Sequence, residues 1–240
     1  MANPLDRLRL NKEARARAAT LGAVLSLILL FQAGSKSRVN FDRRTLLFSL
    51  DGRKVNAGAL RRQLQSMESQ LAAVMVLYVD RLLSGEWKTD KWRDEMEALL
   101  RQSHLLFAAL AAGGLAAVVA EPALLKVAEL RAERDIRYLG GFSEDVRKGK
   151  YKNGRRALNR AKSYLKSARI TYANVQLELA KLAGFTEARR ILNAKESCRR
   201  RLARIGCVEA AERGWVLIDD MPPIGTLVCK QFCLCYLEFR

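Results

Sequence analysis

The chain has 240 residues, of which half are hydrophobic, and a formal net charge of +18. This hydrophobic share excludes a disordered tail and suffices for one good core or two modest ones. Lys and Arg outnumber Asp and Glu by 43 to 25, an excess that compact proteins rarely carry without a polyanionic partner. Nucleic acid is therefore the first candidate partner and an anionic membrane the second, whereas charge carried only for solubility is the alternative.

The first apolar stretch covers residues 21–31 and follows a basic start. It lacks a small-x-small cleavage site, and it is too short to cross a bilayer as a helix. We therefore expect a buried or interfacial helix at this position.

An Asp51-Gly52 pair lies within the next segment. Asp-Gly is a strong hairpin-turn dipeptide, so residues 39–55 are expected to form two short strands or an extended arm. An arm of this kind often clasps a neighbouring subunit in assemblies, and a simple surface turn is the alternative. The apolar helix and the arm together make up the expected N-terminal region, residues 1–57.

Apolar residues recur at helical spacing through residues 58–83, and Ser84-Gly85 ends this predicted helix. Thr89 or Asp90 is expected to cap a second helix, which closes at Gly113-Gly114. Because only a short turn separates the two helices, the sequence predicts an antiparallel hairpin.

A third helix is predicted to begin at Pro122, a residue that suits the first turn, to run toward Tyr138 and to stop at Gly140-Gly141. The apolar run that precedes it, residues 105–120, is interrupted by Gly113-Gly114. We expect that run to be a packed helix end and a turn rather than a membrane span.

The fourth helix has the most regular apolar pattern, with spacings of three and four from residue 158 to residue 182. Such a heptad seam predicts that the helix lies along another helix, in the same chain or in a neighbouring subunit. The seam contacts are expected at Leu158, Leu165, Tyr172, Val175, Leu179 and Leu182.

Residues 147–169 contain ten basic residues and no acidic one. The helical members avoid the seam, so the helix can pack while its positive faces stay free for phosphate. No sequence-reading motif is present, so contact with the nucleic-acid backbone, indifferent to sequence, is expected; a solvated face is the alternative. The candidate nucleic-acid-binding residues are Arg147, Lys148, Lys150, Lys152, Arg155, Arg156, Arg160, Lys162, Lys166 and Arg169.

All five cysteines lie in the last 43 residues. An odd number without a signal peptide argues against a secreted disulfide scaffold. Four thiolates can hold one zinc ion and so stabilise a small region that cannot build its own core; disulfides formed after lysis and free buried thiols are the alternatives. The candidate ligands are Cys198, Cys207, Cys229 and one of Cys233 or Cys235, and the last two point to opposite sides if their segment is extended.

The C-terminal segment resembles a known family. Cys207, Gly214-Trp215, a Pro and Gly turn at residues 222–225 and the closing Cys233-Leu234-Cys235 are similar to the ending of phage minor head proteins of the Mu F-like head morphogenesis family. The helical part, with Gly85-x-Trp87 and a helix that ends in Ala-Gly-Gly, is similar to the N-terminal portion of these proteins. The sequence departs from the family pattern at Arg204, where the first cysteine of a Cys-x-x-Cys pair is expected, and in the loss of the polar members of the closing Asn-Cys-Arg-Cys.

The resemblance implies a structural minor head protein of a tailed bacteriophage, assembled in the host cytoplasm and located in the virion head. Its implied partners are the portal or major capsid protein, packaged DNA bound without sequence preference, and a second copy of the chain. Two alternatives stay open. One is an ejected internal virion protein whose residues 21–31 and basic flank engage the host membrane; the other is a free DNA-binding accessory protein with a zinc ribbon.

The sequence offers little for catalysis, and a non-enzymatic protein is expected. The single histidine, His104, is expected to be a packed helical side chain, and neither a Gly-rich phosphate loop nor a nucleophile elbow is present. The predicted fold is mainly α. Residues 58–195 are expected to form antiparallel helical hairpins or a bundle that includes the long heptad helix. Residues 196–240 are expected to form a small cysteine-containing α+β region.

Overall fold

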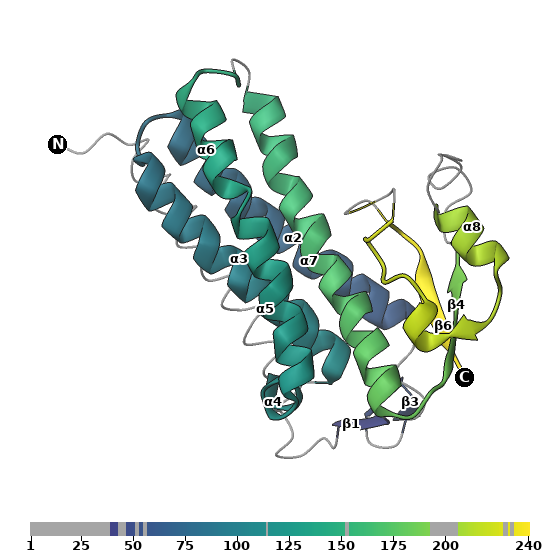
Figure 1. The fold of residues 1–240 in the computed structure, drawn as a ribbon. Coiled ribbons are helices and arrows are strands. Elements are labelled where there is room, and N and C mark those ends of the chain that lie inside the picture. The colour runs from purple at the N-terminus through teal and green to yellow at the C-terminus, as the bar shows by residue number, and fades with distance from the viewer. Residues whose placement is uncertain are drawn as a thin grey trace.

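The computed structural model describes residues 39–42, 47–50, 53–54, 57–113, 115–151, 154–192, 206–227, 230 and 233–240 (Figure 1). The apolar segment at residues 21–31 lies outside these ranges, as do Lys152, Cys198 and Cys229. Over the described residues the chain is mainly helical, with a small cysteine-containing α+β region at its C-terminal end, which confirms the predicted fold class. None of the described helices is long and apolar enough to cross a membrane.

The helical part begins with α2 (Ala57–Leu83) and α3 (Thr89–Ala112), close to the predicted bounds. Gly113 ends α3 in the left-handed conformation at φ 87°, and its N–H donates to the carbonyl of Ala109, as a helix-ending glycine commonly does. The predicted N-cap was wrong: Lys88 precedes α3 in an extended conformation and makes no side-chain capping bond, while Thr89 already belongs to the helix. The short helix α4 (Leu115–Ala120) follows.

Two helices occupy the segment where one was predicted. Helix α5 (Pro122–Ile136) begins at Pro122 as expected, but after a short turn α6 (Leu139–Arg147) continues through Gly140 and Gly141. The prediction that the helix stops at these glycines was wrong. Leu139 and Phe142 are both fully buried in the core, and this burial outweighs the cost of about 1 kcal/mol that each glycine adds in a helix.

The long helix α7 (Gly154–Leu182) lies against α2, α3 and α5 (Figure 1). Of the seam positions, Leu165, Val175 and Leu179 are buried, and Leu158 and Tyr172 are partly buried against the core clusters. Leu182, the last seam residue, is 49% exposed. From residue 158 to residue 179 the seam therefore packs within this chain.

The main core fills the space between α2, α3, α6 and α7. Trp92, Phe107 and Phe142 are completely buried there, and the rings of Trp92 and Phe142 meet edge to face at 5.1 Å between centroids. A smaller, alanine-rich core joins α3, α4 and α5 to the C-terminal half of α7. Its small side chains let these helices approach closely. Helix α7 thus contributes residues to both cores.

The predicted hairpin region contains three strands rather than two. Strands β1 (Val39–Asp42), β2 (Leu47–Leu50) and β3 (Arg53–Lys54) form an antiparallel sheet in the order β1-β2-β3. Strands β2 and β3 pair antiparallel with Leu50 opposite Arg53, while the Asp51-Gly52 turn predicted between them lies outside the described residues.

The C-terminal region is built on a second antiparallel sheet in the order β5-β4-β6. Its strands are β4 (Glu187–Ile191), β5 (Val216–Leu217) and β6 (Tyr236–Phe239), accompanied by α8 (Cys207–Glu212) and the 3-10 helix η1 (Ile218–Asp220). The central strand β4 follows directly on α7 and was not predicted. The region packs against α7 through two small apolar clusters that include Ile170, Leu177 and Ala180.

Candidate metal centre and basic surface

Three cysteines of the C-terminal region come together. The sulfur atoms of Cys207, at the start of α8, and of Cys233 and Cys235, just before β6, all lie within 4.8 Å of one another, and all three residues are buried. Cys233 and Cys235 do not point to opposite sides, because residues 233–235 are irregular and the strand begins only at Tyr236. Three buried cysteines thus lie close enough to hold a metal ion.

Arg190, on the central strand β4, lies beside the cysteine cluster. Arg190 as a whole is 2% exposed, and its Nη1 lies 3.6 Å from Cys207 Sγ and 3.8 Å from Cys233 Sγ. Its Nη2 donates to the carbonyl oxygens of Pro222 and Pro223, whereas its Nε is buried without a hydrogen-bond partner among the described residues. No carboxylate of the described residues pairs with this buried guanidinium, so its charge needs another source of compensation, and the sulfur atoms of Cys207 and Cys233 lie beside it.

The thiols titrate as a group rather than independently. Hydrogen bonds from Cys207 and Cys235 lower the pKa of Cys233, and the positive charge of Arg190 adds to the effect. The hydrogen bonds with Cys233 and Cys235, together with burial, raise the pKa of Cys207. The thiolate form is therefore favoured at Cys233 and disfavoured at Cys207.

The distances suit a zinc ion. Tetrahedral zinc with bonds to sulfur of about 2.3 Å places its ligands roughly 3.8 Å apart, and the Sγ atoms of Cys207 and Cys233 are separated by 3.8 Å. Three thiolates around a divalent ion leave a net negative charge, which the guanidinium of Arg190 would compensate. A closed structural site needs a fourth ligand, for which Cys198 and Cys229, outside the described residues, are the remaining cysteines.

The candidate basic residues divide into two groups. Those around α6 are paired: Glu144 bonds Arg147 and Lys148, and Asp145 bonds Lys150 and Arg160. The hydrogen bonds from Arg147 and Lys148, with a smaller contribution from their charges, lower the pKa of Glu144 to about 2, so this carboxylate is ionised over the working pH range. These cations are in part neutralised, which the sequence did not reveal because both acids precede the basic run.

The second group lies on the N-terminal half of α7. Arg155, Arg156 and Lys162 are exposed, and none of the three has a hydrogen bond or ion pair with another described residue. Lys166 is exposed and Arg169 partly exposed on the same helix. Arg155, Lys162, Lys166 and Arg169 follow at spacings of seven, four and three, so they lie along one side of α7, beside the buried seam.

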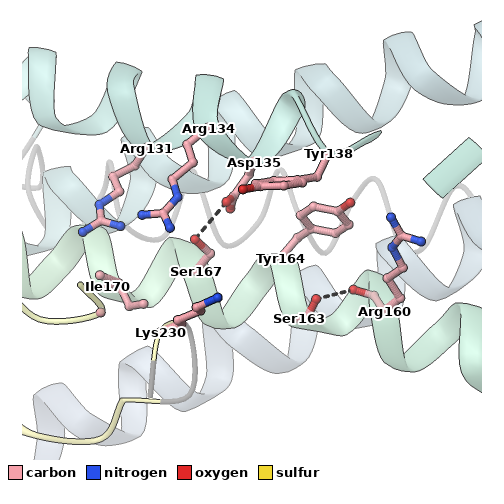
Figure 2. Close-up of a pocket in the computed structure, with 11 residues that line it drawn as sticks. Arg131, Arg134, Asp135, Tyr138, Arg160, Ser163, Tyr164, Ser167, Ile170 and Lys230 are labelled. Carbon is pink, nitrogen blue, oxygen red and sulfur yellow. Dashed lines mark hydrogen bonds between the residues drawn. The ribbon is translucent and has the colours of Figure 1, made fainter. Parts of the chain in front are cut away.

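A cationic pocket of about 290 Å³, not anticipated from the sequence, lies where α5, α7 and the C-terminal segment meet. Figure 2 shows Arg131 and Arg134 reaching from α5 toward α7, with Lys230 approaching from the C-terminal segment and Arg160 at the far end. The rings of Tyr138 and Tyr164 and the hydroxyls of Ser163 and Ser167 also line it, together with Asp135, Ile170 and Gly225.

His104 belongs to a buried polar network. Its Nδ1 lies 2.6 Å from the hydroxyl of Thr171 and its Nε2 lies 3.1 Å from Asp135 Oδ2, while Ser167 donates to Asp135 Oδ1 at 3.0 Å. Hydroxyl, imidazole and carboxylate stand in the order of a catalytic triad, but Thr171 and His104 are 0% exposed, so no substrate reaches them. The side chains of this network come from α3, α5 and α7 and satisfy one another's hydrogen-bonding groups in the core, so the network joins the three helices.

Replacing Asp135 with alanine should lower the free energy of unfolding by about 2 to 4 kcal/mol, because it leaves His104 Nε2 and the Ser167 hydroxyl without their partner in the core. Urea unfolding followed by circular dichroism measures this change. Asp94→Ala is the matched control, since Asp94 is exposed on α3 and should change stability by less than about 0.5 kcal/mol. Equal effects of the two substitutions would contradict the role of the network.

Comparison of the chain with protein-family models, with curated proteins and with solved structures found no match.

Proposed function

We propose that this protein is a non-enzymatic structural protein that contacts the backbone of DNA through the exposed basic residues of α7. The observation that supports the proposal is that this helix has a buried apolar side and an exposed basic side. Its seam is buried in the core, while Arg155, Arg156 and Lys162 face solvent without ion pairs to other described residues. A row of cations on one helix can contact successive phosphates with no preference for base sequence.

The setting that we propose is the head of a tailed bacteriophage, as the resemblance to Mu F-like minor head proteins implies. In this setting the helical part contacts the portal or major capsid protein and the basic side of α7 faces packaged DNA. The exposed apolar side chains Val119, Leu130 and Leu182, on α4, α5 and α7, are available for contact with such a partner.

We further propose that the cysteine cluster binds zinc as a structural ion, with Cys207, Cys233 and Cys235 as three ligands and Cys198 or Cys229 as the fourth. The spacing of the sulfur atoms and the buried positive charge of Arg190 support this proposal. The ion would hold α8 to the segment before β6, which α8 and the short strands cannot do by hydrophobic burial alone.

Substituting Arg155, Arg156 and Lys162 together by glutamine should weaken DNA binding. Three fewer phosphate contacts should make the slope of log K against log salt concentration shallower by about 2 to 3 and lower the affinity roughly 10- to 100-fold near 0.1 M salt. Fluorescence anisotropy with two duplexes of unrelated sequence measures both quantities, and the two duplexes should respond alike.

The matched control removes the same charge elsewhere, by glutamine at Lys88, Arg93 and Lys126. All three are exposed, on or beside α3 and α5, and lie outside the basic run. The control variant should keep nearly the original slope. If both triple variants lose affinity equally, the positive charge acts through net charge alone and α7 has no special part in binding.

The virion setting is tested separately. Mass spectrometry of purified particles should detect the protein with the capsid both before and after DNA ejection. Loss of the protein on ejection would favour an internal protein delivered with DNA, and absence from particles would favour a free DNA-binding accessory protein; either result overturns the head proposal.

A further inference from the structure

The pocket between α5, α7 and the C-terminal segment is distinct from both proposed sites. Apart from Arg160, its cations lie outside residues 147–169, and it contains none of the clustered cysteines. Four cations, Arg131, Arg134, Arg160 and Lys230, line it against the single carboxylate of Asp135. These cations come from three segments far apart in the sequence, so only the folded chain assembles the pocket.

The carboxylate of Asp135 offsets only part of the positive charge of the pocket. Both Asp135 oxygens are engaged by the core network, Oδ1 by Ser167 and Oδ2 by His104. Arg160 has its own partner in Asp145 at 2.7 Å. The positive charges of Arg131, Arg134 and Lys230 therefore remain without a carboxylate of their own among the described residues.

Arg131 is held in place inside the pocket wall. Its Nη2 lies 3.3 Å from the carbonyl oxygen of Ile224, and the side-chain oxygen of Asn174, in the amide orientation that satisfies both groups, accepts from its Nε at 2.9 Å. Burial lowers the pKa of Arg131, and the charge of Arg134 lowers it further. Two arginines thus repel each other across a concave space, and a bound anion would relieve this repulsion.

Arg134 and Lys230 are the cations available to a ligand. Neither has a hydrogen bond or ion pair with another residue of the described part of the chain. Arg134 is partly exposed, Lys230 is exposed, and Figure 2 shows both side chains at the same opening as Ser167. The phenol of Tyr138, on a side chain that is 58% exposed, is a further donor at the rim.

We propose that this pocket binds a phosphate group, with Arg134 and Lys230 as its direct ligands and Arg131 as a fixed positive charge behind them. Guanidinium offers paired N–H donors that match phosphate oxygens, and the ammonium group adds a mobile point charge. The volume suits one phosphate with a small attached group and is too small for a duplex. The phosphate belongs either to a single nucleic-acid strand or to a free phosphorylated molecule.

Isothermal titration calorimetry of the full chain with inorganic pyrophosphate tests the proposal. Saturable binding at one site is expected. The double variant Arg134→Gln with Lys230→Gln should lower the affinity about 10- to 100-fold, as expected for the loss of two charge-assisted hydrogen bonds. The matched variant Arg93→Gln with Lys126→Gln removes the same charge at exposed positions outside both the pocket and the basic run, and it should change the affinity less than about twofold.

Competition with a thymidine hexanucleotide separates the two sources of phosphate. Displacement of the hexanucleotide by pyrophosphate assigns the pocket to a nucleic-acid strand, and independent binding assigns it to a free phosphorylated molecule. Absence of saturable pyrophosphate binding, or equal losses in the two double variants, overturns the proposal. Duplex DNA is proposed to bind α7, so the pocket variant should retain the salt dependence of duplex binding. Failure of one proposal is therefore distinguishable from failure of the other.

Discussion

The Cys207→Ser variant should lose its zinc, whereas the unmodified chain should carry about one zinc ion per molecule. Cys207 supplies one of three sulfur atoms that lie within 4.8 Å of one another, and a serine hydroxyl does not ionise to replace it. Structural zinc binds with an apparent free energy of about 10 to 16 kcal/mol in small domains, so this is the largest effect that we expect. Zinc released under denaturing conditions, measured with a chromogenic chelator, gives the stoichiometry.

Two further variants identify the fourth ligand. Of Cys198→Ser and Cys229→Ser, one should lose zinc as Cys207→Ser does, and the other should retain it. If the unmodified chain contains no zinc and takes up none at micromolar concentration, the metal proposal is wrong and the cluster consists of metal-free cysteines beside Arg190.

Replacing Trp92 with alanine should produce the second large effect. The indole is completely buried at the centre of the main core and meets Phe142 edge to face. Removing it leaves a cavity among α2, α3, α6 and α7, so the free energy of unfolding should fall by about 3 to 5 kcal/mol. For a chain of this size that corresponds to a decrease in Tm of roughly 10 °C, measurable by thermal unfolding.

Trp92→Phe is the control for this substitution. The indole Nε1 is buried without a hydrogen-bond partner among the described residues, so phenylalanine removes an unsatisfied donor as well as some volume. Its cost should be less than half that of alanine. A Trp92→Ala variant that unfolds within about 1 kcal/mol of the unmodified chain would show that the core does not depend on this ring.

The helices were predictable because their signal is local. Apolar spacing and the flanking glycine and proline residues indicated α2, α3, α5 and α7 closely, and the regular seam predicted that α7 lies along another helix. The prediction that a helix stops at Gly140-Gly141 was wrong for a non-local reason. There the local preference to end a helix is weaker than the burial of Leu139 and Phe142, which depends on helices elsewhere in the chain.

The sites were only partly predictable, for the same reason. The cysteines could be named as candidate ligands from their residue type alone. That Cys233 and Cys235 both lie close to Cys207 depends on the irregular conformation of residues 233–235, which no sequence pattern predicts. Arg190 was missed because nothing in the sequence distinguishes it from Arg189; only their alternation on β4 buries one and exposes the other in part. The cationic pocket was missed because its members are separated by up to about a hundred residues.

Helix α7 has a consequence for any attempt to divide the chain. Its second apolar side, which includes Ile170, Leu177 and Ala180, is covered by the cysteine-containing region. A fragment that stops at residue 182 would expose this apolar side to water and would tend to aggregate or to bind another apolar surface. The helical part is therefore not a detachable module, and deletion studies should replace side chains within the intact polypeptide rather than shorten it.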